Sequence, residues 1–364
     1  MGYRISVRDW QACFIHRDQT AMVGYNETIP SHKTRLLTQT RILIVGCGQL
    51  GSRHLQAVSG LADVDAIDVY DPHPESLQLG RERLNEVPDR KVADIRWLSN
   101  LQEADPEGAL CIVATRADVR VALVRQIAAT LGYRSFLLEK IVAQSVPDYR
   151  NLMGFAQEKG LSVWVNCKAR AHASHRHIKA RLDPHLPVIF TAQGGNHGLA
   201  NNGLHAADLF AFYDGGGAIE CVHSQIEPKV YPTKRGNGIF DLNGTLIGRS
   251  KKGSQFLLSF VGEHDSPGHF TVLSAKYRAI VDDMKKLLYE SSSESGWAWQ
   301  PVSFDANLAV SYMTRAFASD ILQKGRCELP TLEECYPAHE FILSALRPHF
   351  NALLGRESDS CPVT

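Results

Sequence analysis

The sequence lacks paired cysteines and long apolar runs. Its eight cysteines stand singly, with no C-x-x-C and no Cys/His spacing that is typical of a zinc site. Scattered single cysteines favour a reducing compartment, so we expect a cytoplasmic protein without a metal centre. No apolar run approaches the roughly 20 residues of a transmembrane helix, and we expect no membrane partner.

An excess of charge of one sign is also missing. The chain has 39 Lys and Arg residues and 39 Asp and Glu residues, so its formal net charge is zero. This balance gives no reason to expect nucleic acid or an anionic membrane surface as a partner. The 15 histidines include those of the segment HASHRHIK (172–179), which we interpret as solvent-facing residues without a ligand.

The length of 364 residues is large for one hydrophobic core, which favours two domains. We expect a dinucleotide-binding domain over 41–165 and a substrate-binding and oligomerisation domain over 166–364. Residues 1–40 carry charges around short apolar pieces and lack the continuous apolar stretch of a signal peptide. We interpret them as an N-terminal extension of unknown role.

Short β-branched segments alternate with helical patterns in the first half of the chain. Such alternation predicts a doubly wound parallel sheet with helices on both faces, an α/β fold. Beyond about residue 185, runs such as VIFTAQGG and SQFLLSFVG alternate apolar and polar residues between Gly, Pro and Asp. These predict a large, mainly antiparallel sheet with one open face. Two helices, 306–324 and 331–350, close the chain, and the second begins with the capping pattern T-L-E-E.

A glycine motif follows the first expected strand. In RILIVGCGQLGSRH, Gly46, Gly48 and Gly51 have the spacing G-x-G-x-x-G between a strand and a helix. Asp71 ends the next strand at the distance that a dinucleotide-binding fingerprint requires. The glycines allow a tight turn, the approach of a pyrophosphate and close packing of the helix. Asp71 can accept hydrogen bonds from ribose hydroxyls, which favours NAD over NADP, although it can also simply start the turn at Pro72.

Two further segments carry candidates for chemistry. Lys140 ends a buried strand at the edge of the sheet where ligands bind, and it could donate a proton to a substrate oxygen. Asn201 and His205 are four residues apart, so they share one face of a helix. From the residues alone, a solvated lysine and a packed histidine are the simpler interpretations.

These segments together resemble the Gfo/Idh/MocA oxidoreductases, the family of glucose-fructose oxidoreductase and inositol dehydrogenase. The similarity runs from about Arg41 to the C-terminus. GCGQLGSRH, VATRADVR and EKI occupy the places of the family's glycine loop, strand-four turn and E-K-P motif. KARAHASHRHIK and GLANNGLHAADLF resemble its N-R-R-F and D-x-G-x-H segments. The latter variant, with TKRGNGIFDLNGTLIG, is most similar to members linked to surface-polysaccharide and unusual-sugar pathways.

The resemblance implies an NAD(P)-dependent dehydrogenase or reductase that transfers a hydride between nicotinamide and a sugar, polyol or sugar derivative. It implies a homodimer or homotetramer, with catalysis by Lys140 and His205. The remaining expected contacts fall into two sets. Those with the cofactor are Gly46, Gly48, Gln49, Leu50, Gly51, Asp71, Ala114, Thr115 and Glu139. Those with the substrate are Lys140, Lys168, Arg170, Asn201 and His205.

Several positions depart from the family pattern. Asn201 stands where the family commonly has Asp and therefore brings no negative charge to His205. Ile141 replaces a proline after the lysine, which favours a trans peptide bond because cis costs about 2.5 to 4 kcal/mol without proline. Arg116 and Arg120 add cations that could meet the pyrophosphate or an anionic substrate. Two alternatives stay open: an imine or tetrapyrrole reductase of the same fold, and a non-catalytic dinucleotide-binding regulatory protein.

Overall fold

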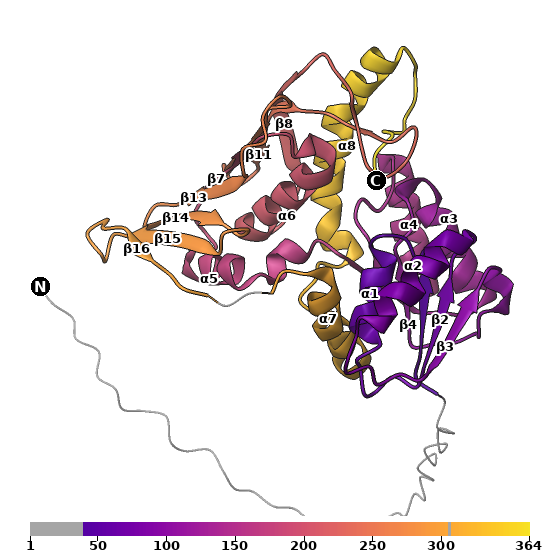
Figure 1. Ribbon diagram of the computed structural model, residues 1–364. Helices are drawn as coiled ribbons and strands as arrows, with labels where there is room; N and C mark the ends of the chain where they lie inside the picture. Colours follow the sequence, from indigo (N-terminus) through magenta and orange to yellow (C-terminus); the bar gives the residue numbers. More distant parts are fainter. Residues whose placement is uncertain (1–38, 305–306) are drawn as a thin grey trace, which may run out of the picture. The chain divides into compact units, whose positions relative to one another are not determined.

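Six parallel strands form the first sheet of the chain, and their order is β3-β2-β1-β4-β5-β6. This order is that of a dinucleotide-binding Rossmann sheet, in which consecutive strands run outward from β1 on both sides. Figure 1 labels β2, β3 and β4 of this sheet. The strands are β1 (Arg41–Val45), β2 (Ala66–Tyr70), β3 (Asp94–Leu98), β4 (Leu110–Val113), β5 (Ser135–Leu138) and β6 (Ser162–Val165). The computed structural model describes residues 39–304 and 307–364, so residues 1–38 of the expected extension lie outside the described residues.

Helices connect these strands and cover the sheet. They are α1 (Gly51–Val58), α2 (Pro74–Asn85), α3 (Ala117–Thr130) and α4 (Val146–Lys159), with a 3-10 turn η1 (Leu101–Glu103). A helix from the end of the chain, α7 (Val310–Lys324), packs beside α1 (Figure 1). Phe317 and Ile321 of α7 join the apolar cluster of Ile42 and Leu55. Residues far apart in the sequence therefore complete the packing of the first sheet.

The second sheet has eight strands in the order β16-β15-β14-β13-β7-β12-β11-β8. All neighbouring pairs are antiparallel except β12 with β7. The strands are β7 (Ile189–Gly194), β8 (Ile219–Ile226), β11 (Gly244–Ser250), β12 (Gln255–Phe260), β13 (His269–Leu273), β14 (Tyr277–Asp282), β15 (Leu287–Ser292) and β16 (Gln300–Pro301). The two sheets confirm the predicted α/β fold class with its mainly antiparallel second sheet.

One face of the eight-stranded sheet is covered by α6 (Gly203–Asp214) and α8 (Leu332–Leu354) (Figure 1). Side chains alternate between the faces because successive residues of a strand point in opposite directions. Phe190 and Phe256 are buried beneath the helices, whereas Ile189, Ile280 and Tyr289 are exposed on the other face. Thr331 caps α8 through the predicted box, since its side chain and that of Glu334 each bond the other's backbone amide.

The remaining elements lie between the two sheets in the sequence or connect their edges. They are the 3-10 turn η2 (Lys168–Ala171), α5 (Ala173–Arg181), the π-helical turn η3 (Gly198–Asn202) and the short hairpin of β9 (Tyr231–Pro232) with β10 (Phe240–Asp241). Within 39–304 and 307–364, the helices are too short or too polar for any of them to cross a lipid bilayer.

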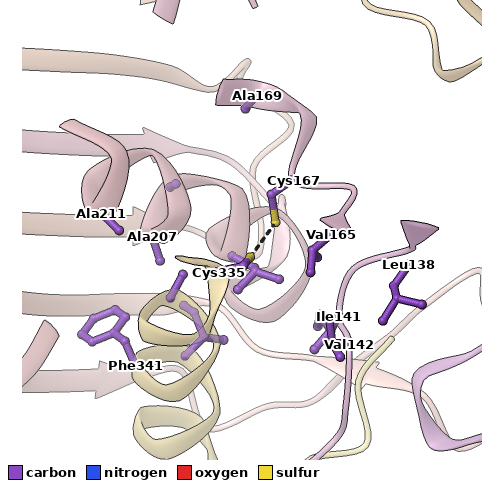
Figure 2. Packing of buried hydrophobic residues seen from close by; sticks show 14 of the residues in the cluster. Leu138, Ile141, Val142, Val165, Cys167, Ala169, Ala207, Ala211, Cys335 and Phe341 are labelled. Atoms are coloured by element: carbon purple, nitrogen blue, oxygen red, sulfur yellow. Dashed lines mark hydrogen bonds between the residues drawn. The ribbon is translucent and has the colours of Figure 1, made fainter. Parts of the chain in front are cut away.

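A single apolar cluster joins residues of both sheets. Leu138 of β5 and Val165 of β6 belong to it together with Ala207 of α6 and Phe341 of α8 (Figure 2). Two thiols lie inside it, with Sγ of Cys167 3.3 Å from Sγ of Cys335. All cysteines of the described part of the chain are free thiols. The continuous cluster fixes the loops that carry the candidate site.

Candidate active site

The glycine loop at the carboxyl end of β1 has the geometry that its spacing predicts. Gly46 adopts φ +86° and donates a hydrogen bond of 2.8 Å to the carbonyl of Tyr70. A Cβ on Gly51 would lie 1.7 Å from the carbonyl oxygen of Gly46, so the helix can approach the loop only with glycine here. A Cβ on Gly48 would meet no atom of the described residues within 4 Å. The loop thus leaves an open space beside bare backbone, which suits a pyrophosphate.

Asp71 lies at the end of β2 beside this loop and is only 6% exposed. Its Oδ2 accepts a hydrogen bond from the amide of Cys47 at 2.7 Å, and its Oδ1 accepts one from the amide of His73 at 2.9 Å. The carboxylate therefore also organises the loop and the following turn. Arg83 adds a positive charge nearby, because it donates to the backbone carbonyl of Gln49 at 2.7 Å. Arg83 is not among the residues that the sequence predicts for the cofactor site.

The end of β4 contributes Ala114 and Thr115. The amide of Ala114 bonds the carbonyl of Val45 at 2.8 Å, and the side chain of Thr115 lies against Gly46. The hydroxyl of Thr115 is buried without a hydrogen-bond partner among residues 39–304 and 307–364. An orphaned hydroxyl beside an open glycine loop fits a polar ligand such as a dinucleotide.

The two arginines that follow β4 lie in different surroundings. Arg120 is 1% exposed, and its guanidinium donates to the carbonyls of Thr115 and Ile141. Arg116 is exposed and pairs with Asp118 at 2.9 Å. Arg120 therefore connects the loops after β4 and β5, because its three-carbon stem reaches back into the core.

Glu139 is a buried connection between four elements. Its Oε1 accepts hydrogen bonds from Asn166 at 2.6 Å and from His54 of α1 at 2.9 Å, and the other ring nitrogen of His54 is 2.9 Å from Thr314 of α7. Burial alone would raise the pKa of Glu139. The hydrogen bond and charge of His54, the hydrogen bond of Asn166 and the charge of Lys140 outweigh it and lower the pKa to about 2.

Lys140 projects from the carboxyl edge of β5 and is nearly buried. Its ammonium donates to the backbone carbonyl of Asn201 at 3.1 Å and to the side-chain oxygen of the same residue. Burial, followed by the charge of Arg235, lowers the pKa of Lys140 to about 8. The structure thus brings Lys140 and Asn201 together from segments 61 residues apart.

The loop after Lys140 is held from two sides. Arg120 bonds the carbonyl of Ile141, and His339 of α8 accepts a hydrogen bond of 3.1 Å from the amide of Val142. The Lys140–Ile141 peptide bond is cis. The expectation of a trans bond, which considered only the local cost of Ile141, was wrong.

Asp241 lies beside Asn201 and is not among the residues that the sequence predicts for the site. It is buried, and it accepts hydrogen bonds from the amides of Ala200 at 2.8 Å, Asn201 at 2.9 Å and Leu242 at 2.8 Å. A Cβ on Gly198 would lie 2.2 Å from Oδ2 of Asp241, so the carboxylate fits only against glycine. Burial raises the pKa of Asp241 to about 6, although the backbone amides and Lys140 oppose this rise. Asp241 fixes the η3 turn and, with it, Asn201.

His205 lies on the first turn of α6 near these groups. Burial lowers its pKa well below the usual value, and the charges of Lys140 and Lys168 lower it further. The imidazole is therefore neutral at pH 7 and can accept a proton. Its Nδ1 is buried, and no atom of the described chain bonds it. Lys168 of η2 donates to the carbonyl of Leu308.

Arg170 and Asp208 form a buried ion pair. Nε and Nη2 of Arg170 lie 2.7 Å from the two carboxylate oxygens of Asp208. This fork-to-fork pairing connects η2 to α6 and occupies much of the guanidinium. A contact of Arg170 with substrate stays a prediction, and the pair gives Arg170 a structural role besides.

Two histidines of the segment 172–179 are buried, so the interpretation of the whole segment as solvent-facing was wrong. His172 is 7% exposed and His175 is fully buried. Nδ1 of His172 and Nε2 of His175 lie 2.9 and 2.8 Å from the same oxygen of Asp283. Asp283 comes from the turn after β14, which the local sequence cannot reveal. The distances are those of hydrogen bonds, and His172 and Asp283 form part of the wall of a pocket of about 1020 Å³.

Residues 40–167 match a family described as an oxidoreductase family with an NAD-binding Rossmann fold. The glycine loop, Asp71 and Lys140 all lie in this segment. Residues 40–167 thus carry the pattern of an oxidoreductase family with an NAD-binding Rossmann fold. Over these residues the match is to the Gfo/Idh/MocA family model, which confirms the resemblance drawn from the motifs. No curated protein matches the chain in sequence.

Several solved structures have the same fold, and nearly their whole length aligns with this chain. A 3-ketoreductase from Actinomadura kijaniata, bound to TDP-benzene and NADP, has a TM-score of 0.65 at 16% identity over 85% of this chain and 96% of its own. UDP-N-acetylglucosamine 3-dehydrogenase from Acidithiobacillus ferrooxidans has a TM-score of 0.64 at 16% identity, over 87% of this chain and 100% of its own. An oxidoreductase from Agrobacterium radiobacter, bound to NAD+, L-tartaric acid and magnesium, has a TM-score of 0.68 at 14% identity, over 86% of this chain and 97% of its own. At these identities the likeness shows the fold of both sheets.

Proposed function

We propose that this protein is an NAD(P)-dependent oxidoreductase that transfers a hydride between nicotinamide and a carbinol or ketone carbon of a sugar, polyol or sugar derivative. The observation that carries the proposal is the meeting of Lys140, Asn201 and the neutral His205 at the edge of a sheet with an open glycine loop. An acid and a base beside a dinucleotide site suit alcohol and ketone chemistry.

The cofactor would be held by the glycine loop with Gln49 and Leu50, by Asp71, and by Ala114 and Thr115 at the end of β4. When bound, its nicotinamide supplies or accepts the hydride. Glu139 lies in the same edge of the sheet and keeps α1 against β5 through His54. Asp71 favours NAD, whereas the charge of Arg83 offers a partner for the additional phosphate of NADP. We propose NAD as the preferred cofactor.

Lys140 would act on the oxygen of the reacting carbon. With a pKa of about 8, its ammonium is mostly protonated at pH 7. It can hydrogen-bond a ketone oxygen and stabilise the negative charge that develops as hydride arrives. In the oxidation direction, His205 would take the hydroxyl proton because burial keeps its imidazole neutral. Asn201 would orient both the ammonium and the substrate, and Lys168 would assist.

Sugar-like substrates are supported by the relatives in structure. Two of them are a 3-ketoreductase and a UDP-N-acetylglucosamine 3-dehydrogenase. An imine or tetrapyrrole reductase is less well supported, since a lysine within electrostatic range of a neutral histidine favours an oxygen at the reacting carbon. A regulatory protein that only binds the dinucleotide is the second candidate, because Asn201 and Ile141 depart from the family pattern.

We also propose a homodimer or homotetramer that associates through the open face of the second sheet. Ile189, Val222, Ile280 and Tyr289 are each at least 40% exposed on its strands. Apolar side chains gathered on one sheet face are typical of subunit interfaces. Sedimentation equilibrium tests this association, and a monomer at micromolar concentration would contradict it.

The test of the proposed reaction is a panel of sugars, polyols and nucleotide sugars offered with NAD, NADH, NADP and NADPH. Absorbance of the reduced nicotinamide reports turnover in both directions. We expect substrate-dependent turnover that Lys140→Ala lowers about 100- to 10,000-fold. Tight binding of the dinucleotide without turnover of any member of the panel would favour the regulatory protein instead.

A further inference from the structure

The hairpin of β9 and β10 carries an arginine, Arg235, beside the candidate site. Its loop, 233–239, is closed by a hydrogen bond of 3.2 Å from the amide of Thr233 to the carbonyl of Ile239. Gly236 and Gly238 adopt φ values of +112° and +77°, which allow the tight path of the loop. Arg235 stands before these glycines and is half-buried.

The base of the same hairpin is fixed inside the site. Asp241, the last residue of β10, bonds the backbone of Asn201, whose side chain receives Lys140. Phe240 donates a hydrogen bond of 2.8 Å to the carbonyl of Pro362. On its outer side the loop meets the fourth-strand turn, since a Cβ on Gly236 would lie 3.5 Å from the guanidinium of Arg116. The loop therefore spans the edge of the Rossmann sheet at β4 and β5.

The guanidinium of Arg235 forms no hydrogen bond or ion pair with residues 39–304 or 307–364, although its backbone amide bonds Thr233 at 3.3 Å. Its charge lowers the pKa of both Lys140 and Arg120, so it lies within electrostatic range of two buried cations. The neighbouring carboxylates are already engaged. Glu139 is bonded by His54 and Asn166, and Asp241 by three backbone amides.

We propose that Arg235 binds an oxyanion of the substrate, a carboxylate or a phosphate, and so selects anionic sugars. This inference rests on the proposed function and defines the class of its substrate. The positive charge of Arg235 is repelled by those of Lys140 and Arg120, and a bound anion would offset this repulsion. The planar guanidinium presents a fork of N–H donors that matches a carboxylate or a phosphate.

The phosphates of the cofactor are the less suitable source. The glycine loop and the beginning of α1 serve the pyrophosphate at the edge of β1, whereas Arg235 acts on Lys140 at the edge of β5. The substrate oxygen that bonds Lys140 would lie between the pyrophosphate site and Arg235. An anionic group a few bonds from the reacting carbon would then reach Arg235.

The experiment measures binding by calorimetry to the full chain saturated with NADH. The probes are D-glucose, D-glucuronate, D-glucose 6-phosphate and UDP-glucose. We expect at least one anionic probe to bind about tenfold or more tightly than glucose, as a charged hydrogen bond provides. Arg235→Gln should remove this preference. The matched control, Lys234→Gln, removes an adjacent exposed charge and should keep it.

Three results would overturn the inference. They are equal affinity of the wild type for glucose and all anionic probes, an unchanged preference in Arg235→Gln, and a tenfold loss of NADH affinity in that variant without any change in sugar binding. The last result would assign the arginine to the cofactor. Because binding is measured without turnover, anionic sugars that bind but do not react would contradict the proposed reaction and leave this site intact.

Discussion

Lys140 donates hydrogen bonds to both the backbone and the side-chain carbonyl of Asn201. The carboxylate of Asp241 fixes the turn that presents Asn201, through the amides of Ala200 and Asn201. A buried ammonium is costly unless its donors are satisfied, so this arrangement stabilises the charged form of the lysine. The position of Lys140 therefore depends on Asp241 of β10, which lies 101 residues further along the chain.

Asp241→Asn should lower the pKa of Lys140 below about 8, because the negative charge of Asp241 raises it. Competitive amine labelling against pH, with the labelled lysine located by mass spectrometry, measures this pKa. Asp265→Asn removes an exposed carboxylate and serves as the control. An unchanged labelling profile of Lys140 in a folded Asp241→Asn variant would show that the carboxylate has no electrostatic role.

Gly48→Val should abolish binding of NADH while the protein stays folded. The added side chain enters open space in the free protein but occupies the approach of the pyrophosphate. Gly51→Ala gives the matched contrast, because its Cβ would clash with the carbonyl of Gly46 and should lower the melting temperature. Fluorescence titration and thermal unfolding separate the two effects. Normal NADH affinity in Gly48→Val would mean that the loop is only a turn.

Asp71 should give the wild type at least tenfold higher affinity for NADH than for NADPH, about 1.4 kcal/mol. Its charge repels the additional phosphate of NADPH. Asp71→Ser should narrow the difference, and Arg83→Gln should widen it because a cation near Gln49 is lost. Equal dissociation constants for the two cofactors in the wild type would refute the preference.

Glu139 should stabilise the fold above about pH 4.5. Its pKa is about 2 in the folded protein and near 4.5 when unfolded, so the stabilisation is lost as pH falls from about 4.5 to about 2. Glu139→Gln should therefore cost about 3 kcal/mol at pH 7, and the difference should shrink toward pH 2. Urea unfolding of both proteins against pH measures it. A difference that does not change with pH would contradict the assigned pKa.

The sequence was sufficient for features that depend on neighbouring residues. The glycine loop and most strands of the first sheet follow from short patterns, and β1 has the expected bounds of 41–45. The capping box of Thr331 is equally local. The catalytic roles of Lys140 and His205 stay predictions. They rest on the order of several motifs, because each residue alone is explained more simply by solvent exposure or packing.

Features that join distant segments were not accessible. Nothing near Asp241 indicates that it bonds the turn before α6, and nothing near His172 indicates that it meets Asp283. Arg120 follows a strand end, as a ligand-binding cation would, yet long-range packing buries it against Ile141. Such contacts depend on how the two sheets and their loops come together, which local periodicity does not encode.

In the proposed reaction, Lys140 and His205 act as one proton-transfer system. Removal of a positioned acid or base typically lowers the rate about 100- to 10,000-fold. Asn201→Asp restores the residue common in the family and should keep activity. The variant should also move the pH optimum upward, because the new carboxylate stabilises the imidazolium form of His205.

The most direct measurement is kcat of Lys140→Ala, His205→Ala and the double variant on a substrate from the panel, with NADH affinity determined in parallel. The account predicts that each single variant loses about 100- to 10,000-fold in kcat and keeps its NADH affinity. The double variant should be little worse than the poorer single one, since residues that act as a unit are not additive. Near wild-type kcat in Lys140→Ala would contradict the account.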